Sequence, residues 1–378
     1  MQDRIKDDAL NPFPWYTFMR EAHPVYYHPQ YHFWQVFRYE DVQRVLSDYA
    51  SFSSAFGDSG PLSSSLISMD PPRHRQLRNI VTQAFTPRSV AQLSQRITAI
   101  INTLLDQIAA TGQMDIIDDL AYPLPVIVIA EMLGIPREDR ERFKMWSDAM
   151  IGASYPEGGN PQAEMSMYFL EMIQKRSQER KDDLISALLD AQIDGQHLNQ
   201  LELLGFCILL LVAGNETTTN LIGNALLCFD EHPETMEQLR AEPALIPGAI
   251  EEVLRYRSPV QYMYRSAIAD IVIRGHEIRA GQTVLARIGS ANRDEAQFPD
   301  ADRFDIKRTP NRHIAFGQGI HFCLGAPLAR LEAKFALTML LERFHEIKRV
   351  AGVPLEATGS DLVYGVKHLP VTFRQSVS

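Results

Sequence analysis

A glycine-rich loop around Cys323 contains the residues whose types and spacing most clearly suggest chemistry. The loop reads FGQGIHFCLG over residues 316–325. Gly317 and Gly319 permit a tight turn that other residues avoid, and the last glycine allows close backbone approach. The segment from about Gly325 to Glu346 predicts a helix that begins just after the cysteine, so free N–H groups should face the sulfur. These features lower the pKa of a thiol and favour the metal-binding thiolate.

Two simpler interpretations of Cys323 are weaker. Most lone cysteines are buried core residues, and this interpretation suits Cys207 and Cys228, which lie in apolar segments with a helical pattern. A core cysteine does not need a glycine-rich loop. A zinc site formed by His321 and Cys323 would lack two further ligands nearby. The loop therefore predicts a metal ligand of another kind.

A polar interruption in a buried helix is the second candidate. Apolar residues predict a helix from about Asn199 to Phe229, and the sequence AGNETT interrupts it at residues 213–218. Buried polar groups are costly without partners, and a glycine inside a helix costs ~1 kcal/mol relative to alanine. A small residue here would leave room for a bound diatomic molecule and water, with Glu216 and Thr217 as a proton relay. Thr219 more simply bonds back to a helix carbonyl.

Two charged clusters complete the set. Glu252 and Arg255 share a helix face, a spacing that alone often means a surface ion pair. The sequence DPPRHRQLR begins at Asp70, which could cap a helix. His74 and Arg78 then lie four residues apart on one helix face, and such a pair could bind a carboxylate. The arginines at 73 and 75 fit a solvated basic face.

Composition excludes several classes of protein. The chain has 378 residues, of which 45% are hydrophobic and 22% charged, and its net charge of −10 argues against nucleic-acid binding. Three dispersed cysteines exclude a disulfide framework. The N-terminus has no signal-peptide pattern, and the apolar run Leu203–Ala213 is shorter than the ~20 residues of a membrane span. We therefore expect a cytoplasmic, soluble enzyme without a membrane span.

The pattern along the chain predicts one mainly α-helical domain over residues 1–378, with a small β portion at both ends. Strands are expected at Val25–His28 and Phe33–Val36, and helices from Glu40 to about Gly248. Short strands follow, and an irregular stretch covers residues 292–319. The other expected strands are 270–273, 276–278, 283–288, the neighbourhood of 363–364, and 371–373.

The Cys323 loop resembles the haem-binding loop of cytochromes P-450, and the sequence APLAR at residues 326–330 follows it as in many soluble bacterial members. The segments LLLVAGNETTTNLI and HIAFGQGIHFCLGAPLARLEA are similar to those of bacilli-type hydroxylases of fatty acids, terpenoids and steroids. This resemblance implies the P-450 fold, a triangular prism with haem b between the long central helix and the helix after the cysteine.

The resemblance also implies roles for individual residues. Cys323 ligates the iron, and Glu216 with Thr217 promotes O–O cleavage. Glu252 and Arg255 match a buried structural motif, with Arg303 as the third member of that network. The propionate ligands are His74, Arg78, Arg265 and His321, and the other residues at the cofactor are Ala213, Phe316, Gly317 and Gly325.

The implied activity is insertion of one oxygen atom from O2 into a C–H bond of a hydrophobic small molecule. Electrons would come from a separate ferredoxin or flavodoxin with its NAD(P)H reductase. The expected docking patch consists of Arg73, Arg75, Arg330 and Lys334, and the expected substrate pocket of Ile67, Leu209, Ala213, Val260, Met263 and Val363. Residues 147–182 form a shorter lid than family members usually have.

Other functions are less consistent with the sequence. A peroxygenase that uses H2O2 directly would usually lack the acid–alcohol pair, which this chain keeps as Glu216 and Thr217. A haem-based sensor or carrier would need no proton relay. A haem-free helical scaffold would explain none of the four clusters.

Overall fold

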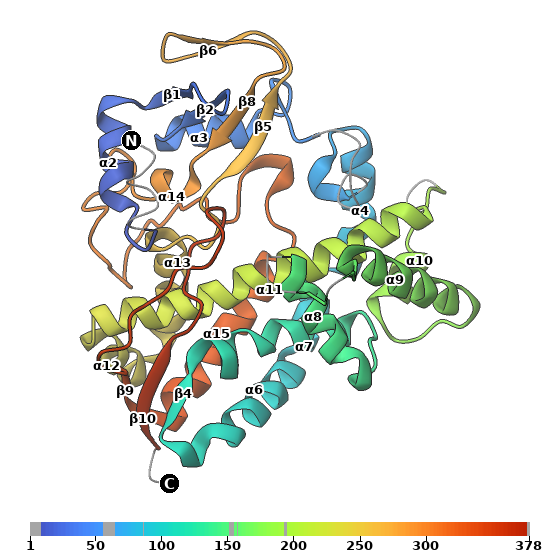
Figure 1. Ribbon diagram of the computed structural model, residues 1–378, viewed down its shortest axis with the longest axis vertical. Coiled ribbons are helices and arrows are strands. Elements are labelled where there is room, and N and C mark those ends of the chain that lie inside the picture. The colour runs from blue at the N-terminus through green and yellow to red at the C-terminus, as the bar shows by residue number, and fades with distance from the viewer. Residues whose placement is uncertain are drawn as a thin grey trace. The chain divides into compact units, whose positions relative to one another are not determined.

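The computed structural model describes residues 9–55, 65–85, 87–150, 155–156, 158–192 and 195–375. Helices predominate, and short strands lie towards both ends of the chain (Figure 1). The chain divides into two compact units built from separated segments. The first unit contains Met1–Ser53, Ile101–Tyr122 and Thr217–Ser378, and the second contains Ser54–Ile100 and Pro123–Glu216. Two helices, α6 (Ser94–Ile108) and α11 (Gln200–Glu231), run from one unit into the other.

The second unit is helical. Its helices are η1 (Leu66–Ser68), α4 (Arg73–Ala84), α5 (Pro87–Gln92), α7 (Pro123–Met132), η4 (Arg137–Asp139), α8 (Arg140–Met150), α9 (Pro161–Gln178) and α10 (Leu184–Asp190). Side-chain caps start two of them: Asn160 accepts from the Ala163 N–H and Asp183 from the Ser186 N–H. Apolar residues spaced three and four apart give a helix one apolar face. Aromatic side chains of α8 and α9 pack together in this way, and the centres of the Phe143 and Phe169 rings lie 5.4 Å apart.

The first unit contains the sheets. A five-stranded sheet has the order β1-β2-β8-β5-β3, in which β2 and β8 are parallel and the other neighbours antiparallel. A three-stranded sheet has the order β4-β10-β9, and β6 pairs with β7. The strands are β1 (Val25–His28), β2 (Phe33–Val36), β3 (Phe52–Ser53), β4 (Gln113–Asp115), β5 (Met263–Ala267), β6 (Ile271–Ile273), β7 (His276–Ile278), β8 (Thr283–Ala286), β9 (Phe344–Arg349) and β10 (Pro370–Gln375).

The first unit also contains helices. They are α2 (Phe13–Ala22), α3 (Tyr39–Ser47), η2 (Ala109–Thr111), the π-helix η3 (Ile117–Ala121), α12 (Glu234–Ala241), η5 (Pro243–Leu245), α13 (Ile246–Tyr256), α14 (Ile288–Ala291), η6 (Gly319–His321) and α15 (Ala326–Arg343). A core of buried apolar residues, among them Val36, Val42 and Phe298, joins the large sheet to α3 and α14.

The expected mainly helical class is confirmed, and most expected elements lie within a few residues of their observed bounds. Four strands were missed: β3 and β4 lie in the stretch expected to be helical, and β5 and β9 were not expected either. Met263–Ala267 forms β5 because it pairs with β8 on one side and β3 on the other. Phe344–Arg349 forms β9, so the last helix ends at Arg343 instead of Glu346. At Val363, where a strand was expected, the structure has only an isolated bridge to Val260.

The length and apolar composition of α11 would also suit a membrane helix, alone among the described helices. In the structure, 56% of its most apolar window is buried inside the protein. The core helix of a folded domain has the same properties, so this helix is weak support for a membrane span.

Candidate active site

The loop before α15 turns tightly around Cys323. Gly317 and Gly319 have φ angles of +73° and +71°, the left-handed region that glycine tolerates. The Cys323 N–H donates to the Phe316 carbonyl at 2.8 Å, which closes the loop. Gly325 is the N-cap of α15, so the partly exposed thiol lies at the positive end of a helix. The predicted backbone geometry is confirmed.

Gly319 and Gly325 differ in how closely other atoms approach them. A Cβ on Gly319 would lie 2.8 Å from the Ser47 Cα, closer than real contacts allow. A Cβ on Gly325 would lie 3.9 Å from the Cys323 Sγ, an ordinary contact, and the φ of Gly325 is −79°. Within the described residues nothing therefore demands glycine at 325, whereas a flat group bound at the sulfur would benefit from the missing side chain.

One face of α11 is accessible near the middle of the helix. Leu209, Ala213, Glu216 and Thr217 have the spacing of a single helix face. Ala213 is exposed and the other three are partly exposed, while Asn215 is 1% exposed. Burial raises the pKa of Glu216, so this carboxyl group holds a proton more readily than an ordinary glutamate. An apolar surface and a group able to exchange protons thus occupy the same face.

Two expectations for this helix need correction. Gly214 was expected to leave room for a small molecule, but a Cβ there would lie 2.6 Å from Ile129 Cδ1. The glycine therefore permits close packing against α7. Thr219 was expected to bond back to its own helix, whereas its hydroxyl donates to the Ala121 carbonyl at 3.1 Å. This partner lies in another element, and sequence spacing does not contain that information.

Glu252 and Arg255 form an ion pair on α13 whose side chains are 0% exposed. Arg255 Nε and Nη2 each donate to the Glu252 carboxylate at 2.8 Å. The other donations of Arg255 reach the carbonyls of Asn292, Ala301 and Arg303, at 3.0, 2.7 and 3.1 Å. The pair therefore ties α13 to the irregular stretch that leads to the Cys323 loop.

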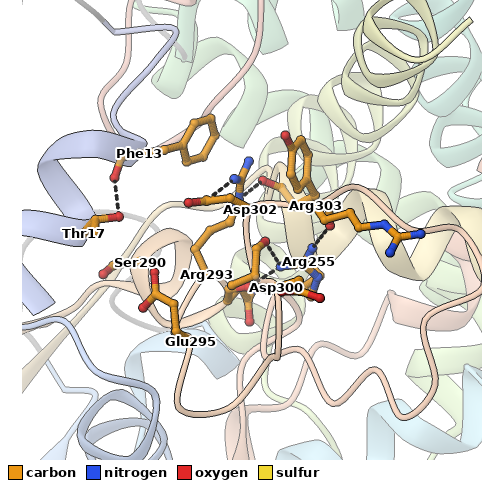
Figure 2. A network of polar contacts seen from close by, with 12 residues as sticks. Phe13, Thr17, Arg255, Ser290, Arg293, Glu295, Asp300, Asp302 and Arg303 are labelled. Carbon is orange, nitrogen blue, oxygen red and sulfur yellow. Dashed lines mark hydrogen bonds and ion pairs between the residues drawn. The ribbon is translucent and has the colours of Figure 1, made fainter.

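Arg303 takes part in this network through its backbone. Figure 2 shows its carbonyl oxygen bonded to Arg255 while its side chain points away, and that side chain is exposed. The second guanidinium at Glu252 belongs to Arg308, whose Nε lies 3.3 Å from Glu252 Oε1. The sequence pattern identified the right segment, but a carbonyl contact can come from any residue type, so the pattern did not identify the charged partner.

The helix α4 carries the pair predicted to bind a carboxylate. His74 is 2% exposed, and burial together with the charge of Arg78 lowers its pKa to about 4. A carboxylate bound here would oppose the effect of Arg78, so the pair fits an anionic group. The N-cap of α4 is Pro72 and not Asp70, which was expected there. The Asp70 carbonyl accepts from the His74 N–H at 3.0 Å, and its side chain accepts from the Ser54 N–H at 3.0 Å.

With this geometry established, comparison with known proteins decides the family. Residues 159–363 match the model of the family described as cytochrome P-450. The chain belongs to the cytochrome P-450 family. It is similar to cytochrome P-450 109 of Bacillus spizizenii, with 46% identity over 376 residues, which cover 96% of this chain and 92% of that protein.

Solved P-450 structures agree over the whole fold. Substrate-free CYP109E1 from Bacillus megaterium has a TM-score of 0.93 at 41% identity, covering 97% of this chain and all of that one. CYP109E1 in complex with testosterone has a TM-score of 0.91 at 42% identity, covering 98% and 100%. The expected fold and the resemblance to bacterial P-450s, including those of bacilli, are confirmed. As a family member the protein is an oxidoreductase, a haem-thiolate monooxygenase with haem b as cofactor.

The residues of this P-450 fit haem b. Cys323 supplies a thiol in a glycine loop, and no Cβ projects beside it from Gly325. Arg265 on β5 is 5% exposed and donates to the Tyr264 carbonyl at 2.7 Å. His321 ends η6 and is partly exposed. Arg265 and His321 lie in the unit that contains Cys323, whereas His74 and Arg78 lie in the other.

Of the predicted pocket residues, the structure brings Val260 and Val363 together through their antiparallel bridge. Met263 is the first residue of β5. Leu209 and Ala213 share the accessible face of α11, and Ile67 is 36% exposed in η1. Their role in substrate binding remains a prediction.

The segment predicted to form the lid, residues 147–182, includes the last turn of α8 and all of α9, and positions 151–154 and 157 lie outside the described residues.

Two of the four predicted docking residues form ion pairs. Arg73 was expected on a solvated face, but it pairs with Glu202, whose side chain is 7% exposed. Arg330 pairs with Glu251 at 2.6 Å. Arg75 and Lys334 are exposed.

Sequence reasoning missed a second support of the Cys323 loop. His313 Nε2 lies 3.0 Å from Glu251 Oε2, and the Arg330 guanidinium lies 4.4 Å from the centre of the Phe316 ring. The adjacent histidine and arginine give Glu251 a pKa of about 2 despite its burial. Arg330, the arginine after the cysteine, was visible in the sequence, but its carboxylate partner Glu251 lies on another helix, α13.

Proposed function

We propose that this P-450 inserts one oxygen atom from O2 into a C–H bond of a fatty acid, terpenoid or steroid. The observation that carries the proposal is the accessible face of α11. On this face Leu209 and Ala213 offer apolar contact close to Glu216 and Thr217. The testosterone complex of CYP109E1, a protein 42% identical to this chain, supports a substrate of steroid size.

In this proposal four residues bind the propionates of haem b and Cys323 binds its iron. The propionate ligands are His74, Arg78, Arg265 and His321. Haem b, when bound, supplies the redox chemistry that activates O2. Phe316 and Gly317 hold the loop, and Gly325 leaves space beside the sulfur.

Glu216 and Thr217 would move the protons that O–O cleavage consumes. The raised pKa of the Glu216 carboxyl group brings proton binding and release closer to neutral pH, where a general acid works best. The Thr217 hydroxyl can accept a proton on one lone pair while it donates its own. The neighbouring Leu209 and Ala213 would keep the substrate close and exclude bulk water.

Electrons would arrive from a separate ferredoxin or flavodoxin with its NAD(P)H reductase, in the cytoplasm. Arg75 and Lys334 are exposed cations suited to an acidic partner. Arg73 and Arg330, which were predicted for the same patch, are each engaged in an ion pair. We therefore assign them a smaller part in docking.

The test of the ligand is the difference spectrum of the reduced protein with carbon monoxide. Wild type should give the far-red-shifted Soret band of a thiolate-bound haem, and Cys323→Ala should lose it. Cys228→Ala is the matched control, because Cys228 is 0% exposed in the core of α11 and should keep the band. A wild-type protein reconstituted with haem that lacks the band would contradict the assignment.

Turnover tests the reaction. Testosterone, a terpenoid and hexadecanoic acid would each be incubated with NAD(P)H and surrogate electron partners, and products identified by mass spectrometry. Hydroxylated products are the expected result. Products formed only with added H2O2 would indicate a peroxygenase, and no product in either condition would favour a carrier or sensor.

A further inference from the structure

A hydrogen bond from the N-terminal helix reaches the segment that contains Val260 and Met263. The Tyr16 hydroxyl on α2 donates to Gln261 Oε1 at 2.7 Å. The two side chains are 3% and 4% exposed, and 245 positions separate them in the sequence. Both residues belong to the first unit. A buried bond of this kind is costly to break, because the amide oxygen then loses its donor inside the protein.

Gln261 connects three other parts of the unit. Its N–H donates to the Leu362 carbonyl at 2.8 Å, and its own carbonyl accepts from the Gly289 N–H at 3.1 Å. Its Nε2 donates to the Ser258 carbonyl at 2.6 Å. A Cβ on Gly289 would lie 2.3 Å from Gln261 Oε1, so α14 needs glycine at this contact. The amide is thus held on several sides, and Tyr16 supplies the donor to its oxygen.

The position of Gln261 determines that of its neighbours. Val260 precedes it and forms the isolated bridge to Val363. The bond from Gln261 to Leu362 lies beside that bridge. Burial raises the pKa of Tyr16, although the charge of Arg287 opposes this. The phenol therefore remains a donor across the working pH range.

We propose that Tyr16 is a positioning residue for substrate specificity. Through Gln261 it holds Val260 and Val363 in place, although Tyr16 itself contacts no substrate. The inference rests on the proposed function and on the predicted substrate pocket, in which Val260, Met263 and Val363 are walls. The side chain of an N-terminal helix would then influence which C–H bond is presented for oxidation.

The test uses the haem-loaded variant Tyr16→Phe. The ring still packs against Met19 and Phe37, so the change removes one oxygen atom and its bond. The dissociation constants of testosterone and hexadecanoic acid, measured from the substrate-induced Soret shift, should change by about two- to tenfold. The ratio of product isomers should change as well. The carbon monoxide spectrum should stay that of wild type.

Tyr39→Phe is the matched control. The Tyr39 hydroxyl donates to the Arg312 carbonyl at 2.7 Å, so this variant also loses one phenol bond, here a partly buried one, away from Gln261. The melting temperature of Tyr39→Phe should fall, as that of Tyr16→Phe should, but the product ratios of Tyr39→Phe should stay those of wild type. Gln261→Leu should reproduce the change of Tyr16→Phe. The double variant should change the product ratio no more than Gln261→Leu alone, because both remove the same bond.

Hydrogen exchange separates this inference from the proposed function. The Gln261 and Gly289 amides should exchange faster in Tyr16→Phe than in Tyr39→Phe, whatever the substrate. Unchanged exchange at these amides, or faster exchange with wild-type binding and product ratios, would overturn the positioning role. A wild-type protein without the thiolate Soret band would instead overturn the proposed function.

Discussion

Glu332 is a carboxyl group enclosed in the protein, and its replacement by glutamine should flatten the pH dependence of stability. It lies on α15 and is 1% exposed. Burial raises its pKa from 4.5 to about 8. Between these values the unfolded chain releases a proton that the folded protein keeps. The free energy of unfolding therefore falls as the pH rises through this interval.

The size of the effect follows from the two pKa values. A rise from 4.5 to about 8, at ~1.4 kcal/mol per unit, limits the total loss to roughly 5 kcal/mol. The part between pH 5 and pH 8 is on the order of 3 kcal/mol. Glutamine carries no titratable proton, so Glu332→Gln should match wild type near pH 5 and exceed it by about this amount at pH 8.

Urea unfolding of the haem-loaded protein, followed by circular dichroism from pH 5 to pH 8, measures this difference. Other titrating groups are common to both proteins and cancel in the comparison. Glu342→Gln is the control, because Glu342 is an exposed residue on the same helix, and its slope should equal that of wild type. Parallel slopes for wild type and Glu332→Gln would refute the reasoning.

Two further variants test the site and its support. Thr217→Ala should uncouple NAD(P)H consumption from product and release peroxide, while Thr219→Ala, which removes the hydroxyl that bonds to the Ala121 carbonyl, should keep the coupling. Equal coupling in both, measured as product per NAD(P)H consumed, would remove the proton-relay role. Arg255→Leu leaves the buried Glu252 carboxylate without its main ion partner and should cost about 3–5 kcal/mol in urea unfolding. Arg303→Ala keeps the backbone carbonyl and should change stability by less than about 0.5 kcal/mol; a large loss there would contradict the assignment of the carbonyl as its contribution.

The Cys323 loop could be predicted because its constraints are local. Gly317 and Gly319 adopt positive φ angles that follow from residue type, and the helix after the loop begins where its pattern begins. The accessible face of α11 was predictable for the same reason, since Leu209, Ala213, Glu216 and Thr217 share a face by spacing alone.

Contacts with distant segments were not predictable from single positions. Gly214 packs on Ile129, and Thr219 bonds to the Ala121 carbonyl. In each case the partner is 85 or more positions away, so no local pattern identifies it. Sequence reasoning assigned both residues to local roles because a helix offers local explanations first.

Short strands show the same limit. Met263–Ala267 became β5 because two strands lie beside it, and its few residues carry too little periodicity to distinguish a strand from a loop. The strand β9 continues directly from α15, where the apolar pattern had suggested more helix. Pairing with β10 decided its conformation.

The sequence by itself determined the family, the predicted thiolate ligand and the acid–alcohol pair, since these depend on residue types at fixed spacings within short segments. Tertiary structure decided which groups meet. It paired Arg73 with Glu202, placed Arg308 beside Glu252, and joined Tyr16 to Gln261. Such contacts form because burial requires each polar group to find a partner, and only the folded chain brings those partners within reach.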